Sequence, residues 1–189
     1  MVEQFRSGYV SIVGKTNAGK STLLNSILGQ KIAITSRKPQ TTRHRFLGIK
    51  TESENQIIFV DTPGFHSGQK RALNRYMNKV AANALRGVDI VLYLIDKLDW
   101  QEDDLQRLKS IPNETSVILV VNKIDKLKDK DSLLPFIEER NKDDLFSSII
   151  PISALKGINL DELVDLICDK LPYGSHLYPE DQITDISEK

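Results

Sequence analysis

A glycine-rich turn near the N-terminus holds the residues best suited to chemistry. An apolar run at residues 9–13 leads into it, Lys20 and Ser21 close it, and a helical pattern follows at residues 21–28. This order of strand, turn and helix is typical of a phosphate-binding P-loop, in which backbone N–H groups and a helix N-terminus surround an anion. We expect Lys20 to contact the β- and γ-phosphates as a catalytic residue and the Ser21 hydroxyl to bind Mg²⁺. The candidate nucleotide-binding residues here are Gly14, Lys15, Thr16, Asn17, Ala18, Gly19, Lys20, Ser21 and Thr22.

A second motif stands at the end of a later apolar run, where Asp61 is followed by Gly64. Alone, Asp-Thr-Pro-Gly is an ordinary turn after a strand. After a P-loop it predicts a sensor of metal and γ-phosphate, because phosphoryl transfer needs an ion that bridges the β and γ oxygens. We expect the Asp61 carboxylate to hold Mg²⁺ through a water and the Gly64 N–H to face the γ-phosphate as part of catalysis. The motif comprises Asp61, Thr62, Pro63 and Gly64.

A third motif would select the base. Asn122, Lys123 and Asp125 follow an apolar run at residues 117–121. The Asp125 carboxylate can accept hydrogen bonds from the ring N1–H and the amino group of guanine, whereas adenine presents a bare acceptor there. A buried carboxylate left unpaired costs several kcal/mol, which is enough to reject ATP. Asn122 can tie this loop to the P-loop, and the stem of Lys123 can lie over the ring.

A turn after the last predicted strand, at Ser153, Ala154 and Leu155, would complete the base site. The Ala154 N–H would donate to guanine O6 and oppose the amino group of adenine. By itself this triplet is more often only a turn, and its position after a strand supports the functional interpretation. Together the motifs predict GTP and GDP as ligands, with Mg²⁺ as cofactor.

A long loop is predicted at residues 30–42, which lack a periodic pattern and contain Pro39. Loops of this length in compact domains are usually functional. We expect a threonine hydroxyl, Thr42 rather than Thr41, to complete the Mg²⁺ shell and to act in catalysis. The loop would order with GTP and relax with GDP, as a switch does. Basic residues without an acidic one fill the stretch from Lys31 to Lys50, which is either a solvated loop or a segment facing an anion.

The elements that position these motifs alternate between strands and helices. Continuous apolar runs predict buried parallel strands, and residues 45–51 and 56–61 predict an antiparallel pair at one edge. Asn159 and Glu162 suggest a capping box at the start of the last helix. The pattern predicts an α/β, P-loop NTPase fold: a doubly wound, mostly parallel six-stranded sheet with one antiparallel edge strand and about five helices. The remaining strands are predicted at residues 90–95, 117–121 and 149–152, and the remaining helices before residue 85 and at 102–110, 132–140 and 160–171.

Composition sets the broad class. A chain of 189 residues favours one domain, expected at residues 1–172, followed by a tail at 173–189 that alone would be a mobile terminus. The 26 basic and 26 acidic residues give no net charge, so global charge predicts no affinity for nucleic acid or membranes. Cys168 is the only cysteine, which fits a reducing, cytoplasmic location and a buried, unreactive thiol.

Beyond these motifs, the chain resembles the Era family of bacterial ribosome-assembly GTPases. The P-loop and the Asn-Lys-x-Asp motif specify only a GTPase. The Era-like features lie at residues 34–45 (Ile-Thr-Ser-Arg-Lys-Pro-Gln-Thr-Thr-Arg-His-Arg), 60–66, 73–78 and 177–185. The resemblance runs from about residue 8 to the final residues.

The resemblance implies a G domain that hydrolyses GTP and acts in maturation of the small ribosomal subunit and its rRNA, in the cytoplasm or peripherally on the inner membrane. In that family the tail leads to an RNA-binding KH domain. No Gly-x-x-Gly loop of the KH type occurs in this chain, so we expect that domain, and direct sequence-specific RNA binding, to be absent from it.

Asn17 resembles an asparagine with which related GTPases hold K⁺, although it can also serve only the turn. Phe65 stands where Ras-type enzymes carry a water-orienting glutamine, which predicts slow intrinsic turnover.

Three interpretations therefore stand. The first is a GTP-hydrolysing switch that times release from a ribosomal precursor. The second is a nucleotide sensor that does not hydrolyse GTP and whose loop at residues 30–42 is read by a partner. In the third, the basic loop docks directly on RNA or anionic lipid, and binding would then depend on salt.

Overall fold

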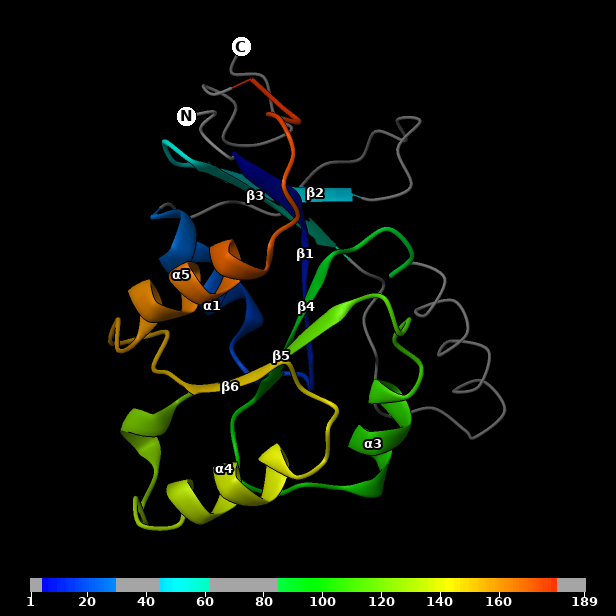
Figure 1. Ribbon diagram of the computed structural model, residues 1–189. Coiled ribbons are helices and arrows are strands. Elements are labelled where there is room, and N and C mark those ends of the chain that lie inside the picture. Colours follow the sequence, from blue (N-terminus) through cyan, green and yellow to red (C-terminus); the bar gives the residue numbers. More distant parts are fainter. Residues whose placement is uncertain (1–4, 30–44, 62–84, 180–189) are drawn as a thin grey trace.

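The computed structural model describes residues 5–29, 45–61 and 85–179. They form one six-stranded sheet in the order β2-β3-β1-β4-β5-β6, with helices on both sides of it (Figure 1). Only β2 runs antiparallel to its neighbour, and every other pair is parallel. The strands are β1 (Arg6–Gly14), β2 (Arg45–Thr51), β3 (Asn55–Asp61), β4 (Ile90–Ile95), β5 (Ser116–Val121) and β6 (Ser148–Pro151). The helices are α1 (Lys20–Leu28), α3 (Glu102–Leu108), α4 (Leu133–Asn141), α5 (Leu160–Lys170) and the 3-10 turn η1 (Ile124–Lys126).

Two apolar cores lie on the two faces of the sheet. One is built with α1 and α5 and the other with α3 and α4. Alternate residues of β4 divide between them: Leu92 packs toward α1 and α5, whereas Val91 and Tyr93 pack toward α3 and α4. Because strand side chains alternate between faces, a strand covered on both sides must be apolar throughout, as β4 is.

These observations confirm the predicted fold class, including the antiparallel pairing of β2 with β3. Four α-helices lie within the described ranges, close to the expected five. The helix predicted before residue 85 and the loop predicted at residues 30–42 fall outside the described residues. Within the described ranges, no helix has both the length and the apolar character that crossing a bilayer would require.

The predicted capping box at the start of α5 is wrong. Asn159 does occupy the N-cap position, but its backbone is left-handed, with φ 56°, and its side chain makes no cap hydrogen bond. The Asn159 amide donates instead to the Pro151 carbonyl at the end of β6, 2.8 Å away. An asparagine tolerates this backbone region better than most residues, so Asn159 fixes the turn into α5.

The tail is also more ordered than predicted as far as residue 179. The Gly174 N–H donates to the Phe5 carbonyl at 2.9 Å. Gln56, a fully buried residue of β3, accepts hydrogen bonds from the N–H groups of Leu177 and Tyr178 and donates to the Tyr178 carbonyl. The segment is held because these polar contacts satisfy a buried amide that would otherwise be costly.

Candidate nucleotide-binding site

The P-loop follows β1 directly and ends at the first turn of α1. Its two glycines are required by space. A Cβ at Gly14 would lie 2.3 Å from the Leu94 carbonyl oxygen of the adjacent strand, and one at Gly19 would lie 2.3 Å from the Asn122 amide nitrogen. Gly19 also has φ 103°, which other residues rarely adopt. The backbone can therefore pack closely against strand β4 and against the loop after β5.

Lys20 lies over the loop that precedes it. Its ammonium donates to the carbonyl oxygens of Gly14 and Lys15, each at 2.9 Å. Burial lowers the pKa of the Lys20 ammonium from its ordinary value. A nearby anion would oppose that effect, because an opposite charge favours the charged form. Lys20 is thus placed at the P-loop as the predicted phosphate contact requires.

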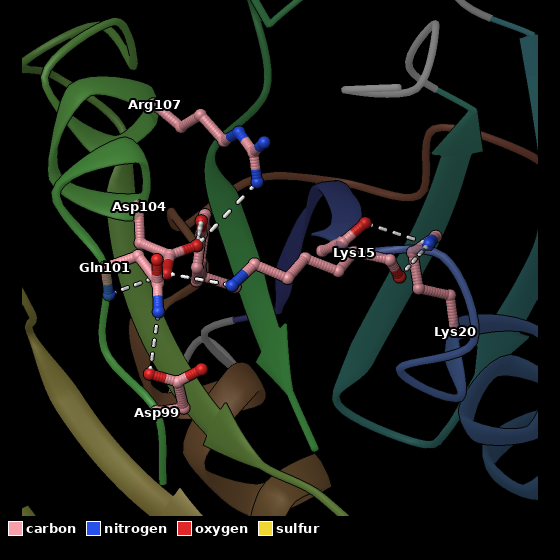
Figure 2. A network of polar contacts seen from close by, with 8 residues as sticks. Lys15, Lys20, Asp99, Gln101, Asp104 and Arg107 are labelled. Carbon is pink, nitrogen blue, oxygen red and sulfur yellow. Dashed lines mark hydrogen bonds and ion pairs between the residues drawn. The ribbon is translucent and has the colours of Figure 1, made fainter. Parts of the chain in front are cut away.

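Lys15 departs from the simple P-loop expectation. Its side chain extends to Asp104 of α3, with the ammonium 3.2 Å from the carboxylate oxygen Oδ2, while Lys20 approaches the backbone of Lys15 from the other side (Figure 2). The predicted contribution of Lys15 to nucleotide binding therefore falls on its backbone.

Asn122 joins the P-loop to the base motifs. It is almost completely buried, its amide donates to the Ala18 carbonyl at 2.9 Å, and its oxygen accepts the Ala154 N–H at 3.0 Å. The predicted tie between base loop and P-loop is thus present. The Ala154 N–H, predicted to donate to guanine O6, contacts Asn122 in this structure. One side chain therefore brings together the P-loop, β5 and the turn after β6.

Lys123 directly precedes η1, and Asp125 is its middle residue. The Lys123 ammonium donates to the Asn17 carbonyl of the P-loop and pairs with Asp96 at 2.8 Å. Asp125 is exposed, and its carboxylate accepts a hydrogen bond from the Ser153 hydroxyl at 2.6 Å. That hydrogen bond lowers the pKa of the Asp125 carboxyl. An ionised, oriented acceptor suits the N1–H and amino group of guanine.

The remaining predicted residues fall into three groups. The side chains of Thr16, Asn17, Ser21, Thr22 and Leu155 are exposed, and that of Ala18 is buried. Asp61 is the last residue of β3, beside β1, although its side chain lies outside the described residues. Thr42, Thr62, Pro63 and Gly64 also lie outside the described residues.

Two carboxylates at this edge were missed from the sequence. Asp96 follows β4 directly, as Asp61 ends β3 and as Asn122 follows β5, so its place at the carboxyl end of a strand was the available signal. Asp104 stands in an acidic run with Glu102 and Asp103 at the start of α3, and such a run usually indicates a solvated helix end. Its burial could not be inferred from that pattern.

Comparison with known proteins identifies the family to which this chain is similar. A family model described as 50S ribosome-binding GTPase matches residues 9–123. The chain is 54% identical over 187 residues to the GTPase Era of Azotobacter vinelandii and 56% identical over 187 residues to that of Marinobacter nauticus. These matches cover 97% of this chain and 62% and 61% of the two relatives, so the chain spans less than two thirds of their length.

Two solved structures are similar to the fold, each with a TM-score of 0.79, 46% identity, and coverage of 97% of this chain and 63% of the other. One is Era in complex with MgGDPNP and nucleotides 1506–1542 of 16S ribosomal RNA. The other is a variant of Aquifex aeolicus Era bound to GDP.AlF4-. The matches confirm the resemblance to Era that the motifs indicated.

Proposed function

Since the chain belongs to the family of 50S ribosome-binding GTPases, we propose that it binds and hydrolyses GTP as a Mg²⁺-dependent molecular switch, with residues 1–172 as its G domain. The observation that carries this proposal is the placement of Asn122 between the Ala18 carbonyl and the Ala154 N–H. This arrangement gathers a phosphate loop and a guanine-selective carboxylate, Asp125, at one edge of the sheet. Era proteins solved with MgGDPNP and with GDP.AlF4- support the same ligand class.

The described residues fit a magnesium nucleotide. The Ser21 hydroxyl lies in the first turn of α1, next to Lys20, and Asp61 ends the strand that pairs with β1. Hydroxyl and carboxylate oxygens are the ligands that Mg²⁺ prefers. Ser21, Asp61 and Thr42 would hold the ion, which when bound neutralises charge on the β- and γ-phosphates. Asn17 is proposed as an additional ligand for K⁺.

The protein's own part in hydrolysis is electrostatic. Lys20 supplies a positive charge beside the P-loop, whose backbone amides and helix N-terminus face the phosphates. The Gly64 N–H is proposed to contact the γ-phosphate. Asp125, oriented by Ser153, holds the guanine ring so that the phosphates reach Lys20 in a fixed position.

We further propose that the switch acts in assembly of the small ribosomal subunit and its rRNA. The support is the similar Era structure, which holds nucleotides 1506–1542 of 16S ribosomal RNA. On this proposal residues 173–189 correspond to the tail that in the Era family leads into an RNA-binding domain. The protein would work in the cytoplasm, with peripheral contact at the inner membrane. Cell fractionation into cytosol, ribosomal subunits and membranes tests the location.

Calorimetry with GDP and ADP, each with Mg²⁺, tests nucleotide binding. Heat with GDP and none with ADP is expected, and equal heats would refute the guanine assignment. Single-turnover phosphate release, with and without small ribosomal subunits, separates a hydrolysing switch from a sensor that only binds GTP. No release under either condition would favour the sensor, which is the candidate suggested by Phe65.

A further inference from the structure

Asp104 is a buried carboxylate shared by helix α3 and the P-loop. Only 1% of its side chain is exposed. Its oxygen Oδ1 accepts the Tyr93 hydroxyl at 2.8 Å and lies 3.7 Å from the Arg107 guanidinium. Its oxygen Oδ2 accepts both the Gln101 N–H at 3.1 Å and the Lys15 ammonium at 3.2 Å (Figure 2). One atom therefore serves the start of α3 and the phosphate loop together.

Most of this network is explained by the fold. The Gln101 N–H would be unsatisfied at the start of α3 without a side-chain acceptor. Tyr93 belongs to the buried strand β4, and its hydroxyl needs a partner inside the core. Burial, and then the neighbouring Asp104 carboxylate, raise the pKa of Tyr93. These contacts would hold Asp104 in place even if the P-loop made no contact with it.

The contact with Lys15 is different. The Lys15 side chain is 39% exposed, so its ammonium could be hydrated without a protein partner. Folding therefore does not require this ion pair in order to satisfy the lysine. The pair does fix the position of residue 15 relative to a rigid, buried group, which is a constraint on the P-loop.

The backbone of Lys15 is where that constraint takes effect. Its carbonyl accepts the Lys20 ammonium at 2.9 Å and the Ala18 N–H at 3.2 Å. Lys20 is the proposed phosphate contact, and Ala18 is fully buried inside the loop. Any movement of residue 15 would displace both groups. The chain of contacts thus runs from Asp104 through Lys15 to the proposed phosphate site.

We propose that Asp104 is a positioning residue for phosphate binding, which holds Lys15 so that the Lys15 carbonyl sets the places of Lys20 and the Ala18 N–H. This inference rests on the proposed function of the P-loop as a nucleotide site. It assigns α3 a part in that site, although α3 contributes no phosphate ligand. Lys15 is then held away from the phosphates and is not itself a direct ligand.

A double-mutant cycle tests the proposal. GDP binding with Mg²⁺ is measured by calorimetry for the wild type, Asp104→Asn, Lys15→Gln and the double variant. Each single variant should weaken GDP binding about fivefold, and the double variant should bind no more weakly than either one, because both remove the same contact. Additive losses would overturn the proposal. The proposal would also be overturned if Lys15→Gln weakened GDP binding and Asp104→Asn did not, because Lys15 would then act directly on phosphate.

Arg107→Gln is the matched control. It removes another cation that faces the Asp104 carboxylate, one that comes from α3 itself and not from the P-loop. Its GDP affinity should equal that of the wild type, even if its unfolding midpoint falls. If Arg107→Gln weakens GDP binding as much as Asp104→Asn does, the network acts only through the stability of α3, and the proposal is wrong.

A second measurement needs no nucleotide. Amide hydrogen exchange of the Ala18 N–H, which donates to the Lys15 carbonyl, is followed in the nucleotide-free proteins. Exchange should be several times faster in Asp104→Asn and Lys15→Gln than in wild type and Arg107→Gln. Unchanged exchange would overturn the proposal. Should the wild type bind no guanine nucleotide, the proposed function fails, and Ala18 exchange still decides whether Asp104 positions the loop. If Asp104→Asn does not fold, the rate of Ala18 N–H exchange in Lys15→Gln decides the question instead.

Discussion

Replacing Asn122 with alanine should damage stability and nucleotide binding together. The truncation removes two hydrogen bonds and leaves the Ala18 carbonyl and the Ala154 N–H without their partner. Ala18 and Ala154 are both buried, so water does not readily replace the lost contact. Each buried group left unsatisfied costs about 1–3 kcal/mol, so the free energy of unfolding should fall by about 2–6 kcal/mol. That is a large share of the stability of an ordinary domain.

The effect on binding has a separate cause. In the native chain the P-loop and the base loop are fixed relative to each other before the nucleotide arrives. Without Asn122 the nucleotide must order both loops itself, which costs affinity. We expect GDP to bind about tenfold more weakly. Unfolding is measured in urea without nucleotide, because bound ligand would add its own stabilisation. GDP affinity is measured by calorimetry with Mg²⁺.

Gln56→Leu provides the matched control. Gln56 is also a fully buried amide with several hydrogen bonds, but it lies in β3 against the tail, where it contacts Leu177 and Tyr178. It should destabilise the fold by a similar amount and leave GDP affinity unchanged. The reasoning is refuted if Asn122→Ala costs less than about 1 kcal/mol. It is also refuted if the two variants lose GDP affinity equally.

Four further outcomes are expected at other positions. Asp125→Asn should change the base preference from guanine to xanthine, because the asparagine amide can accept from the ring N1–H and donate to the xanthine C2 carbonyl. Competition between GDP and xanthosine diphosphate measures this preference. The Ser153 hydrogen bond lowers the pKa of Asp125, so Ser153→Ala should raise that pKa and move the loss of GDP binding on acidification to higher pH, seen in affinity against pH. GTP hydrolysis should be faster in KCl than in NaCl if Asn17 holds K⁺, and equal rates would remove that role. Burial raises the pKa of the Cys168 thiol to about 11, above its ordinary value. The free energy of unfolding should therefore fall as the pH rises from about 9 toward 11, which is measured by unfolding in urea at several pH values. The buried thiol should also resist a disulfide reagent at about pH 8 until the chain unfolds.

The sheet was predictable because its strands carry their own signal. Residues 90–95 are apolar without interruption, and a strand with cores on both faces leaves no position for a polar side chain. The bounds of β4 match the predicted residues for that reason. The P-loop was equally predictable, since glycine, lysine and serine have local roles that depend on their spacing in the chain.

Contacts between distant residues were not predictable in the same way. Asp104 is preceded by Glu102 and Asp103, and nothing in that acidic run shows which carboxylate is buried. Its partner Lys15 lies 89 residues away, in the P-loop. The ordered tail shows the same limit, because Gln56 can hold Leu177 and Tyr178 only after β3 has joined the sheet.

The charges around the P-loop show why one lysine is singled out. Among the described residues, the ammonium groups of Lys20 and Lys123 contact P-loop carbonyl oxygens, and Lys15 belongs to the loop itself. In the described part of the chain, Lys15 is paired with Asp104 and Lys123 with Asp96, so their charges are largely compensated. Lys20 contacts the carbonyl oxygens of Gly14 and Lys15, which carry only partial negative charge, and no described carboxylate. A polyphosphate would therefore meet one uncompensated ammonium, that of Lys20, while the ion pairs of Lys15 and Lys123 hold the loop.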